Sequence, residues 1–233
     1  MNYFPVALPF LLLFAILFLF LIIFIEVGIL RYAYERIGIG RRHMFGLLTL
    51  SFLGSYINIP LFRLPGHRVA SGAVVHFFGM PYMIPIVRDW PGTIVAINLG
   101  GAVIPIILSM YLMKQNRIFR QGLVGTVIVA FFVHLMAYPV EGVGIAIPVF
   151  IPPLIAAIIA LLLSRQYAPP LAYIAGSLGT LLGADILNLG EIQSLGAPVA
   201  SIGGAGTFDG IFMTGILSVL MASLMTRRSR AVR

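Results

Sequence analysis

Long apolar segments, separated by short polar connections, make up most of this chain. Each segment is long enough to cross a hydrocarbon core about 30 Å thick at a rise of roughly 1.5 Å per residue. Several contain proline or glycine, which membrane-spanning helices tolerate better than helices in water. The pattern predicts seven spans, at about 4–30, 44–62, 92–113, 121–140, 145–163, 168–189 and 205–226. We therefore expect an all-α fold, a polytopic transmembrane helix bundle that forms a single domain over residues 1–233.

The longest connection, at about 63–91, breaks the helical pattern. Its central stretch AVVHFFGMPYMIPIV (73–87) is rich in β-branched and aromatic residues and carries Gly79 and Pro81 in its middle. Such a stretch is typical of a β-hairpin or of a loop in the membrane interface. Pro81 and Pro85 make an eighth span unfavourable. We expect a hairpin-like external loop, and its part 74–87 is a candidate for pairing with an extended peptide as an added strand.

The orientation of the bundle follows from its lysines and arginines, which mark cytoplasmic connections. Counting alternate connections, the two sides carry twelve and three basic residues. The first side has Arg31, Arg36, Arg41, Arg42, Lys114, Arg117, Arg120, Arg165, Arg227, Arg228, Arg230 and Arg233, and the second has Arg63, Arg68 and Arg88. This bias predicts a multi-pass protein of the cell membrane with its N-terminus outside and its C-terminus in the cytoplasm.

The amino-acid composition agrees with a lipid environment and excludes several kinds of functional group. Sixty per cent of the residues are hydrophobic and nine per cent are charged, far from the averages of soluble domains. The chain has no cysteine, which excludes disulfides, thiol nucleophiles and iron–sulfur clusters. The first apolar run, Phe4 to Ile25, lacks the basic start and cleavage site of a signal peptide, so we expect it to be retained. The formal charge of +8 lies in short clusters between spans, so no nucleic-acid partner is expected.

Two acidic residues fall inside predicted spans. Asp185 precedes the expected outer end of the sixth span by four residues, and Asp209 follows the expected outer start of the seventh by four. Both carboxyls would lie roughly 6 Å below the same boundary. A buried aspartate costs about 3 kcal/mol on insertion scales, so such residues are candidates for function. We expect the two to face each other.

Other polar residues are predicted at the same depth. They are Asn58, Asn98, His134 and Asn188. The seventh span opens with a glycine-rich stretch that exposes backbone N–H groups near a helix start; its glycines are Gly203, Gly204, Gly206 and Gly210. Together these residues predict a water-accessible cavity that opens to the outside. The structural alternative is that Asp209 caps its helix and Asp185 holds helices together through an asparagine.

Two adjacent carboxyls share a proton, so one can activate water while the other polarises a carbonyl. This chemistry needs no metal or cofactor, and we expect neither. It favours an aspartic-type intramembrane endopeptidase in which Asn98, Asn188 and His134 orient the Asp185/Asp209 pair. The main alternative is a proton- or cation-coupled transporter or channel that uses the same acids. The sequence leaves the oligomeric state open.

Several stretches resemble a known family. They are SYINIPLF (55–62), AINLGGAVIPIILSMYL (96–112), GTLLGADILNLG (179–190) and GAPVASIGGAGTFDGIF (196–212). They resemble an uncharacterised family of prokaryotic multi-pass membrane proteins, domain of unknown function sixteen-fourteen, which implies no activity.

A second resemblance is to the intramembrane aspartyl proteases of the Gly-x-Gly-Asp type, such as presenilin, signal peptide peptidase and prepilin peptidase. In this resemblance, Asp185 corresponds to their first catalytic aspartate and Asp209 to their second. Here the motif is Gly-x-Gly-x-x-Asp, because Thr207 and Phe208 precede Asp209. The resemblance implies a transmembrane or signal-like peptide as the substrate.

Overall fold

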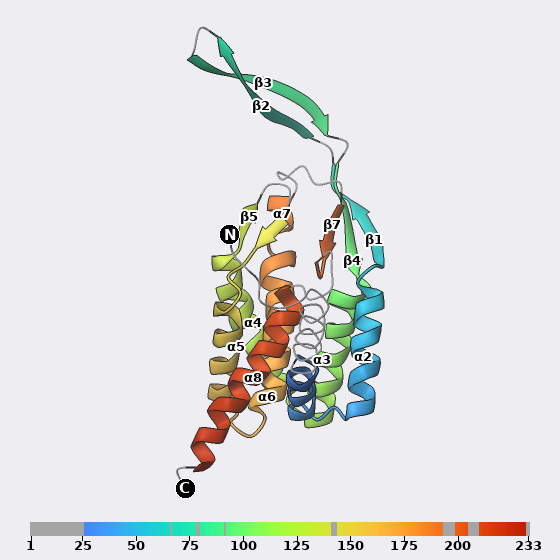
Figure 1. Cartoon of the computed structure of the whole chain (residues 1–233), viewed down its shortest axis with the longest axis vertical. Coiled ribbons are helices and arrows are strands. Elements are labelled where there is room, and N and C mark those ends of the chain that lie inside the picture. The colour runs from blue at the N-terminus through green and yellow to red at the C-terminus, as the bar shows by residue number, and fades with distance from the viewer. Residues whose placement is uncertain are drawn as a thin grey trace, which may run out of the picture.

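The computed structural model of the chain describes residues 26–65, 67–77, 80–90, 92–140, 144–192, 199–204 and 210–231. Most of this part is helical. The helices run alongside one another as a bundle, with a small β-sheet at one end (Figure 1). We call this the sheet end and the other the opposite end.

The helices of the bundle follow in chain order, and strands lie between several of them. A helical segment covers 26–36. It is followed by α2 (Arg41–Gly54), α3 (Ile104–Asn116), α4 (Phe119–Met136), α5 (Ile151–Leu163), α6 (Ala168–Thr180), the short α7 (Leu189–Ile192) and α8 (Gly210–Ala231). Two π-helical segments extend the bundle toward the sheet end: η1 (Leu99–Val103) leads into α3, and η2 (Leu181–Ile186) continues α6.

The strands of the described residues form three small sheets. The first has the order β1 (Asn58–Arg63), β4 (Ile94–Asn98) and β7 (Val199–Ile202), with β1 antiparallel and β7 parallel to β4. The second is the hairpin of β2 (His67–Phe77) and β3 (Met80–Trp90), which pairs from His67↔Trp90 to Phe77↔Met80. The third joins β5 (Tyr138–Val140) to β6 (Gly144–Ala146).

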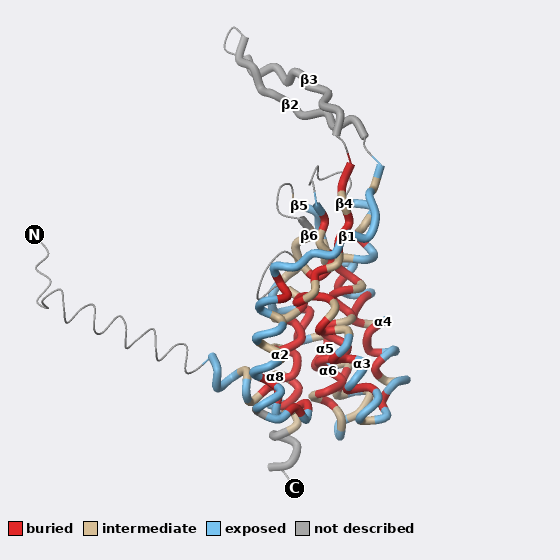
Figure 2. The backbone as a smooth tube through the Cα atoms, turned by 90° about the vertical axis from the view of Figure 1, so that its right-hand side faces the viewer, coloured by how far each residue is buried: buried red, intermediate tan, exposed pale blue. Residues whose placement is uncertain are grey.

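Helix α6 is the centre of the bundle. Its residues are buried on nearly every side, and it packs against α3, α4, α5 and α8 (Figure 2). Small residues permit the close approach to α8: the hydroxyl of Ser218 donates to the carbonyl of Ala172 at 2.8 Å. The largest cluster of buried apolar side chains extends from α6 to the 26–36 helix, α2, α3, α5 and α8. This packing fixes where η2, and with it Asp185, lies at the sheet end.

The mostly helical fold was predicted correctly, but the all-α description is incomplete. The segment expected as a span over 44–62 ends its helix at Gly54 and continues as β1, and the one expected over 92–113 begins as β4. These two segments pair with each other, with Asn58 opposite Asn98. β-Branched residues on β4 and Pro60 on β1 favour the extended backbone. The expected hairpin within 63–91 is present as β2 and β3.

Two helices among the described residues are long and apolar enough to cross a membrane. They are Phe119–Met136 and the continuous helix Ala168–Glu191. Two shorter apolar helices cover Ile151–Leu163 and Gly210–Thr226. The helices over 119–136 and 168–191 correspond to the spans expected at 121–140 and 168–189. Most of the first expected span, 4–30, lies outside the described residues.

Candidate functional site

Two parallel strands end side by side, and each leads into a pair of glycines. Ile97 of β4 lies opposite Ile202 of β7. Gly100 and Gly101 then begin the path into α3, and Gly203 and Gly204 begin the path toward α8. Gly203 and Gly204 have φ values of +94° and +75°, which residues with side chains rarely adopt.

The two glycine pairs bring backbone into direct contact with backbone. A Cβ placed on Gly101 would overlap the carbonyl oxygen of Gly203, and one on Gly203 would come within 2.6 Å of the backbone nitrogen of Ala102. On the other side, a Cβ on Gly100 would overlap the carbonyl oxygen of Ser51 in α2. Glycine is therefore required here by close packing, which fixes the relative position of three chain segments.

Asn98 is the central hydrogen-bonding residue of this region, and it is fully buried. Its Nδ2 donates to the carbonyl of Ser55 at 2.7 Å and to Oδ1 of Asn58 at 3.0 Å. Its Oδ1 accepts from the backbone N–H of Gly101 at 2.8 Å, which caps η1. Both donors and the acceptor of the amide are used, so Asn98 holds β1, β4 and η1 together.

Ser201 of β7 joins the same network. Its hydroxyl oxygen lies 2.6 Å from Oδ1 of Asn58 and 2.8 Å from the carbonyl oxygen of Gly204. The hydroxyl has one proton, so it donates to one of these acceptors at a time. Sequence reasoning did not single out Ser201. The signal available was its position in a short extended stretch, VASI, directly before the glycine pair.

Asp185 approaches the network from η2 and is half-buried. Its Oδ2 accepts a hydrogen bond of 2.7 Å from the backbone N–H of Gly203. The first of the two predicted acids is thus bonded to the turn that precedes the second. Gly206 and Asp209 lie outside the described residues, and Gly210 begins α8. We call Asn58, Asn98, Asp185 and Ser201 the sheet-end polar cluster.

The structure places Asn188 and His134 in contrasting surroundings. Asn188 is buried, but its Nδ2 donates to the carbonyls of Gly183 and Ala184, at 2.7 and 3.0 Å. It therefore satisfies carbonyls of its own helix, where the wider π turn changes which residues share a face. His134 is exposed in the last turn of α4 and makes no hydrogen bond to the sheet-end polar cluster as described. Among the described contacts, neither residue makes one that would orient Asp185.

The described part of the chain holds no group of three or more histidine, aspartate or glutamate side chains arranged to bind a metal ion. What the sheet-end polar cluster provides is a carboxylate, two amides, a hydroxyl and several backbone carbonyls. These groups suit proton transfer and hydrogen bonding to a peptide, and their oxygens suit cation coordination.

Comparison with known proteins gives a family for the chain. A family model described as "Protein of unknown function (DUF1614)" matches residues 52–221, which include the whole sheet-end polar cluster. The chain belongs to this family, so the first resemblance seen in the sequence is confirmed. No curated protein and no solved structure matches the chain. The comparisons give no support to the resemblance to intramembrane aspartyl proteases.

Proposed function

We propose that the chain is a multi-pass protein of the cell membrane, with the seven spans, outside N-terminus and cytoplasmic C-terminus that its sequence predicts. Its surface supports this. Large apolar side chains are exposed along the outward faces of α3 and α4, among them Ile107, Val127, Phe131 and Leu135, each more than half exposed. Hydroxyl groups such as that of Ser218 are buried inside. Apolar residues facing outward suit a bundle surrounded by lipid.

Within this membrane protein, we propose an aspartic-type intramembrane endopeptidase that uses Asp185 and Asp209. The observation that carries the proposal is the hydrogen bond from the Gly203 N–H to Asp185 Oδ2. It ties the first acid to a turn that precedes the second acid by only six residues along the chain. The bond also orients the Asp185 carboxyl through a backbone group, whose position is fixed by the close packing of Gly203 against Gly101.

In the proposed reaction, one carboxylate takes a proton from a water molecule while the other, protonated, donates to the carbonyl oxygen of the scissile peptide bond. The attacking water oxygen forms a bond to the carbonyl carbon. The resulting tetrahedral species then breaks its C–N bond: the first carboxyl gives the proton it took from water to the departing amine, and a hydroxyl of the species returns a proton to the second carboxylate as the C=O bond forms again. This division of roles requires the two carboxyls to lie close enough to share a proton.

The edge of β7 is the favoured position for an extended substrate. β7 is one of the two edge strands of its sheet as described, its first residue Val199 is exposed, and its last residue directly precedes Gly203. A peptide that adds to this edge as a further strand would run past Asp185. The sequence makes the loop 74–87 a candidate for this pairing, and most of this loop forms the β2–β3 hairpin. We propose β7 as a second position, because β7 leads directly to Gly203 and so to Asp185.

The test is cleavage of a panel of membrane peptides by the full chain in proteoliposomes. Asp185→Asn and Asp209→Asn, each made alone, are expected to abolish cleavage. The protein should stay folded in Asp185→Asn, because the amide oxygen can still accept the hydrogen bond from Gly203. Glu191→Gln is the matched control, because Glu191 is an exposed acid in α7. Cleavage that is absent from the wild type, or that survives both substitutions, contradicts the proposal.

The second candidate is a proton- or cation-coupled transporter or channel that uses the same acids. The arrangement of oxygens favours it: Asn58 Oδ1, the Ser201 hydroxyl and the carbonyl of Gly204 lie together near the π turns of η1 and η2. π turns within helices are frequent at functional sites. Ion or proton flux into proteoliposomes that is lost in Asp185→Asn, without any peptide cleavage, would favour this candidate over the protease.

A further inference from the structure

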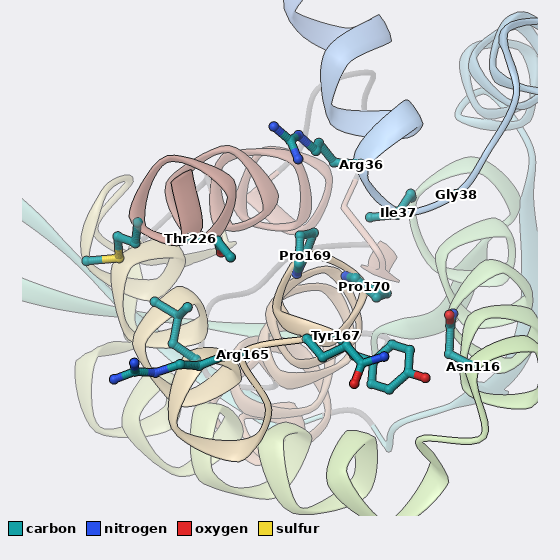
Figure 3. A pocket seen from close by; sticks show the side chains of 12 residues that line it. Arg36, Ile37, Gly38, Asn116, Arg165, Tyr167, Pro169, Pro170 and Thr226 are labelled. Atoms are coloured by element: carbon teal, nitrogen blue, oxygen red, sulfur yellow. The ribbon is translucent and has the colours of Figure 1, made fainter. Parts of the chain in front are cut away.

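A cavity lies at the opposite end of the bundle. It has a volume of about 830 Å³, is open on one side, and is lined by residues from the end of the 26–36 helix and the turn after it, α3, the connection between α5 and α6, and α8 (Figure 3). Its polar lining includes Arg36, Asn116, Arg165, Tyr167 and Thr226. None of the described residues that line it is acidic. The lining therefore carries two positive charges and no negative charge.

Both arginines are available to an anion. The guanidinium carbon of Arg36 lies 4.9 Å from the centre of the Tyr32 ring, a cation–π contact that positions the side chain and leaves its N–H groups able to donate. The neighbouring acid, Glu35, already pairs with Arg31 at 2.7 Å. That pair is the one salt bridge within the residues that the structure describes. Neither Arg36 nor Arg165 is neutralised by a described carboxylate.

The start of α6 adds to the positive potential of the pocket. Pro169 and Pro170, in the first turn of α6, line the cavity. The helix dipole favours an anion at this end, but the two prolines have no N–H to donate. An anion here would therefore be held by side chains, chiefly the two guanidinium groups, whose planar donor arrangement matches phosphate oxygens.

An apolar groove of about 370 Å³ continues from the pocket along α5 and α8. It shares Leu161, Arg165 and Met225 with the pocket and adds Ile158 and Leu162. Leu162 is 77% exposed, so the groove is open to the surroundings of the bundle. A charged pocket that continues into an open apolar groove suits a ligand with an anionic head and a hydrocarbon tail.

We propose that this pocket and groove bind an anionic phospholipid. Its phosphate would bind Arg165, which lines both the pocket and the groove, Arg36 would add to the positive potential of the pocket, and one acyl chain would follow the groove over Ile158 and Leu162. The inference rests on the membrane location proposed above and is independent of the Asp185/Asp209 chemistry. It also agrees with the predicted cytoplasmic side, where anionic lipids attract basic residues.

The experiment is a lipid titration of the purified full chain, followed by native mass spectrometry. The probes are dioleoylphosphatidylglycerol and dioleoylphosphatidylcholine. We expect the first to bind more tightly, and Arg36→Gln/Arg165→Gln to weaken it roughly thirtyfold, about 1 kcal/mol for each arginine. Lys114→Gln/Arg120→Gln is the matched control: both residues are exposed near the same end, outside this pocket, and the same charge is removed.

A second pair of measurements separates a lipid from a free anion. Leu162→Ser is expected to weaken phosphatidylglycerol binding while the protein stays folded, because Leu162 is exposed. Inorganic phosphate is expected to compete poorly. Equal binding of both lipids, equal losses in the two double variants, or tight binding of phosphate with no effect of Leu162→Ser would each overturn the proposal. Release of the protein from membranes by alkaline carbonate would instead contradict the membrane location.

Discussion

The two ends of the bundle are built in contrasting ways. At the sheet end, the polar cluster is neutral apart from Asp185, and hydrogen bonds join segments that are distant in the sequence. At the opposite end, arginines line an open pocket without described carboxylate partners. The first end depends on close backbone packing for its shape, whereas the second keeps its charges accessible. Substitutions should therefore affect folding at the sheet end and ligand binding at the opposite end.

The largest effect is expected from Gly101→Ala. The new Cβ would overlap the carbonyl oxygen of Gly203, and since both are fixed by backbone, β4 and β7 would have to separate. We expect a loss of about 3 kcal/mol in the free energy of unfolding, the upper part of the range for overpacking. Thermal unfolding in detergent measures it. Gly46→Ala is the control, because its Cβ would meet nothing within 4 Å. Equal melting temperatures for the two variants would contradict the close contact.

Asn98→Ala should have the next largest effect. It would leave the buried carbonyl of Ser55 and the N–H of Gly101 without their hydrogen bonds to this side chain. An unsatisfied buried polar group costs about 1–3 kcal/mol, and we expect a total loss of about 2 kcal/mol. The comparison is Asn116→Ala at the opposite end, where the amide donates to a carbonyl of its own helix. A larger loss for Asn116→Ala in chemical unfolding would reverse the contrast between the ends.

The smallest effect on stability is expected from Arg165→Gln. The side chain is exposed and has no described carboxylate partner, so its removal should change the free energy of unfolding by less than about 0.5 kcal/mol. The same unfolding assay measures it. A loss of unfolding free energy close to that of Asn98→Ala would mean that Arg165 supports the fold. This result would contradict the contrast between the two ends.

The sequence predicted the helices better than the junctions between them. The predicted spans 121–140 and 168–189 cover nearly the same residues as α4 and as α6 together with η2. A long apolar run has few alternatives to a helix. The sequence also placed Asn58 and Asn98 in one polar layer. In the structure, Nδ2 of Asn98 donates to Oδ1 of Asn58.

The strands and π turns could not be predicted in the same way. β1 and β4 are stabilised by pairing with each other across a long stretch of chain, and a local apolar pattern carries no information about such a partner. The π turn of η2 alters which residues share a face, so spacing alone could not show that Asn188 bonds to its own helix. Ser201 was missed because its acceptors come from β1 and from the glycine turn.

The central claim is that Asp185 and Asp209 lie close together, and crosslinking tests it most directly. The chain has no cysteine, so Asp185→Cys/Asp209→Cys introduces the only two thiols. The account predicts rapid intramolecular crosslinking by a short bifunctional thiol reagent in membranes, seen as a mass increase with loss of both free thiols. The control, Asp185→Cys/Thr226→Cys, joins the sheet end to the opposite end and should stay uncrosslinked. An Asp185→Cys/Asp209→Cys protein that reacts no better than this control would contradict the account.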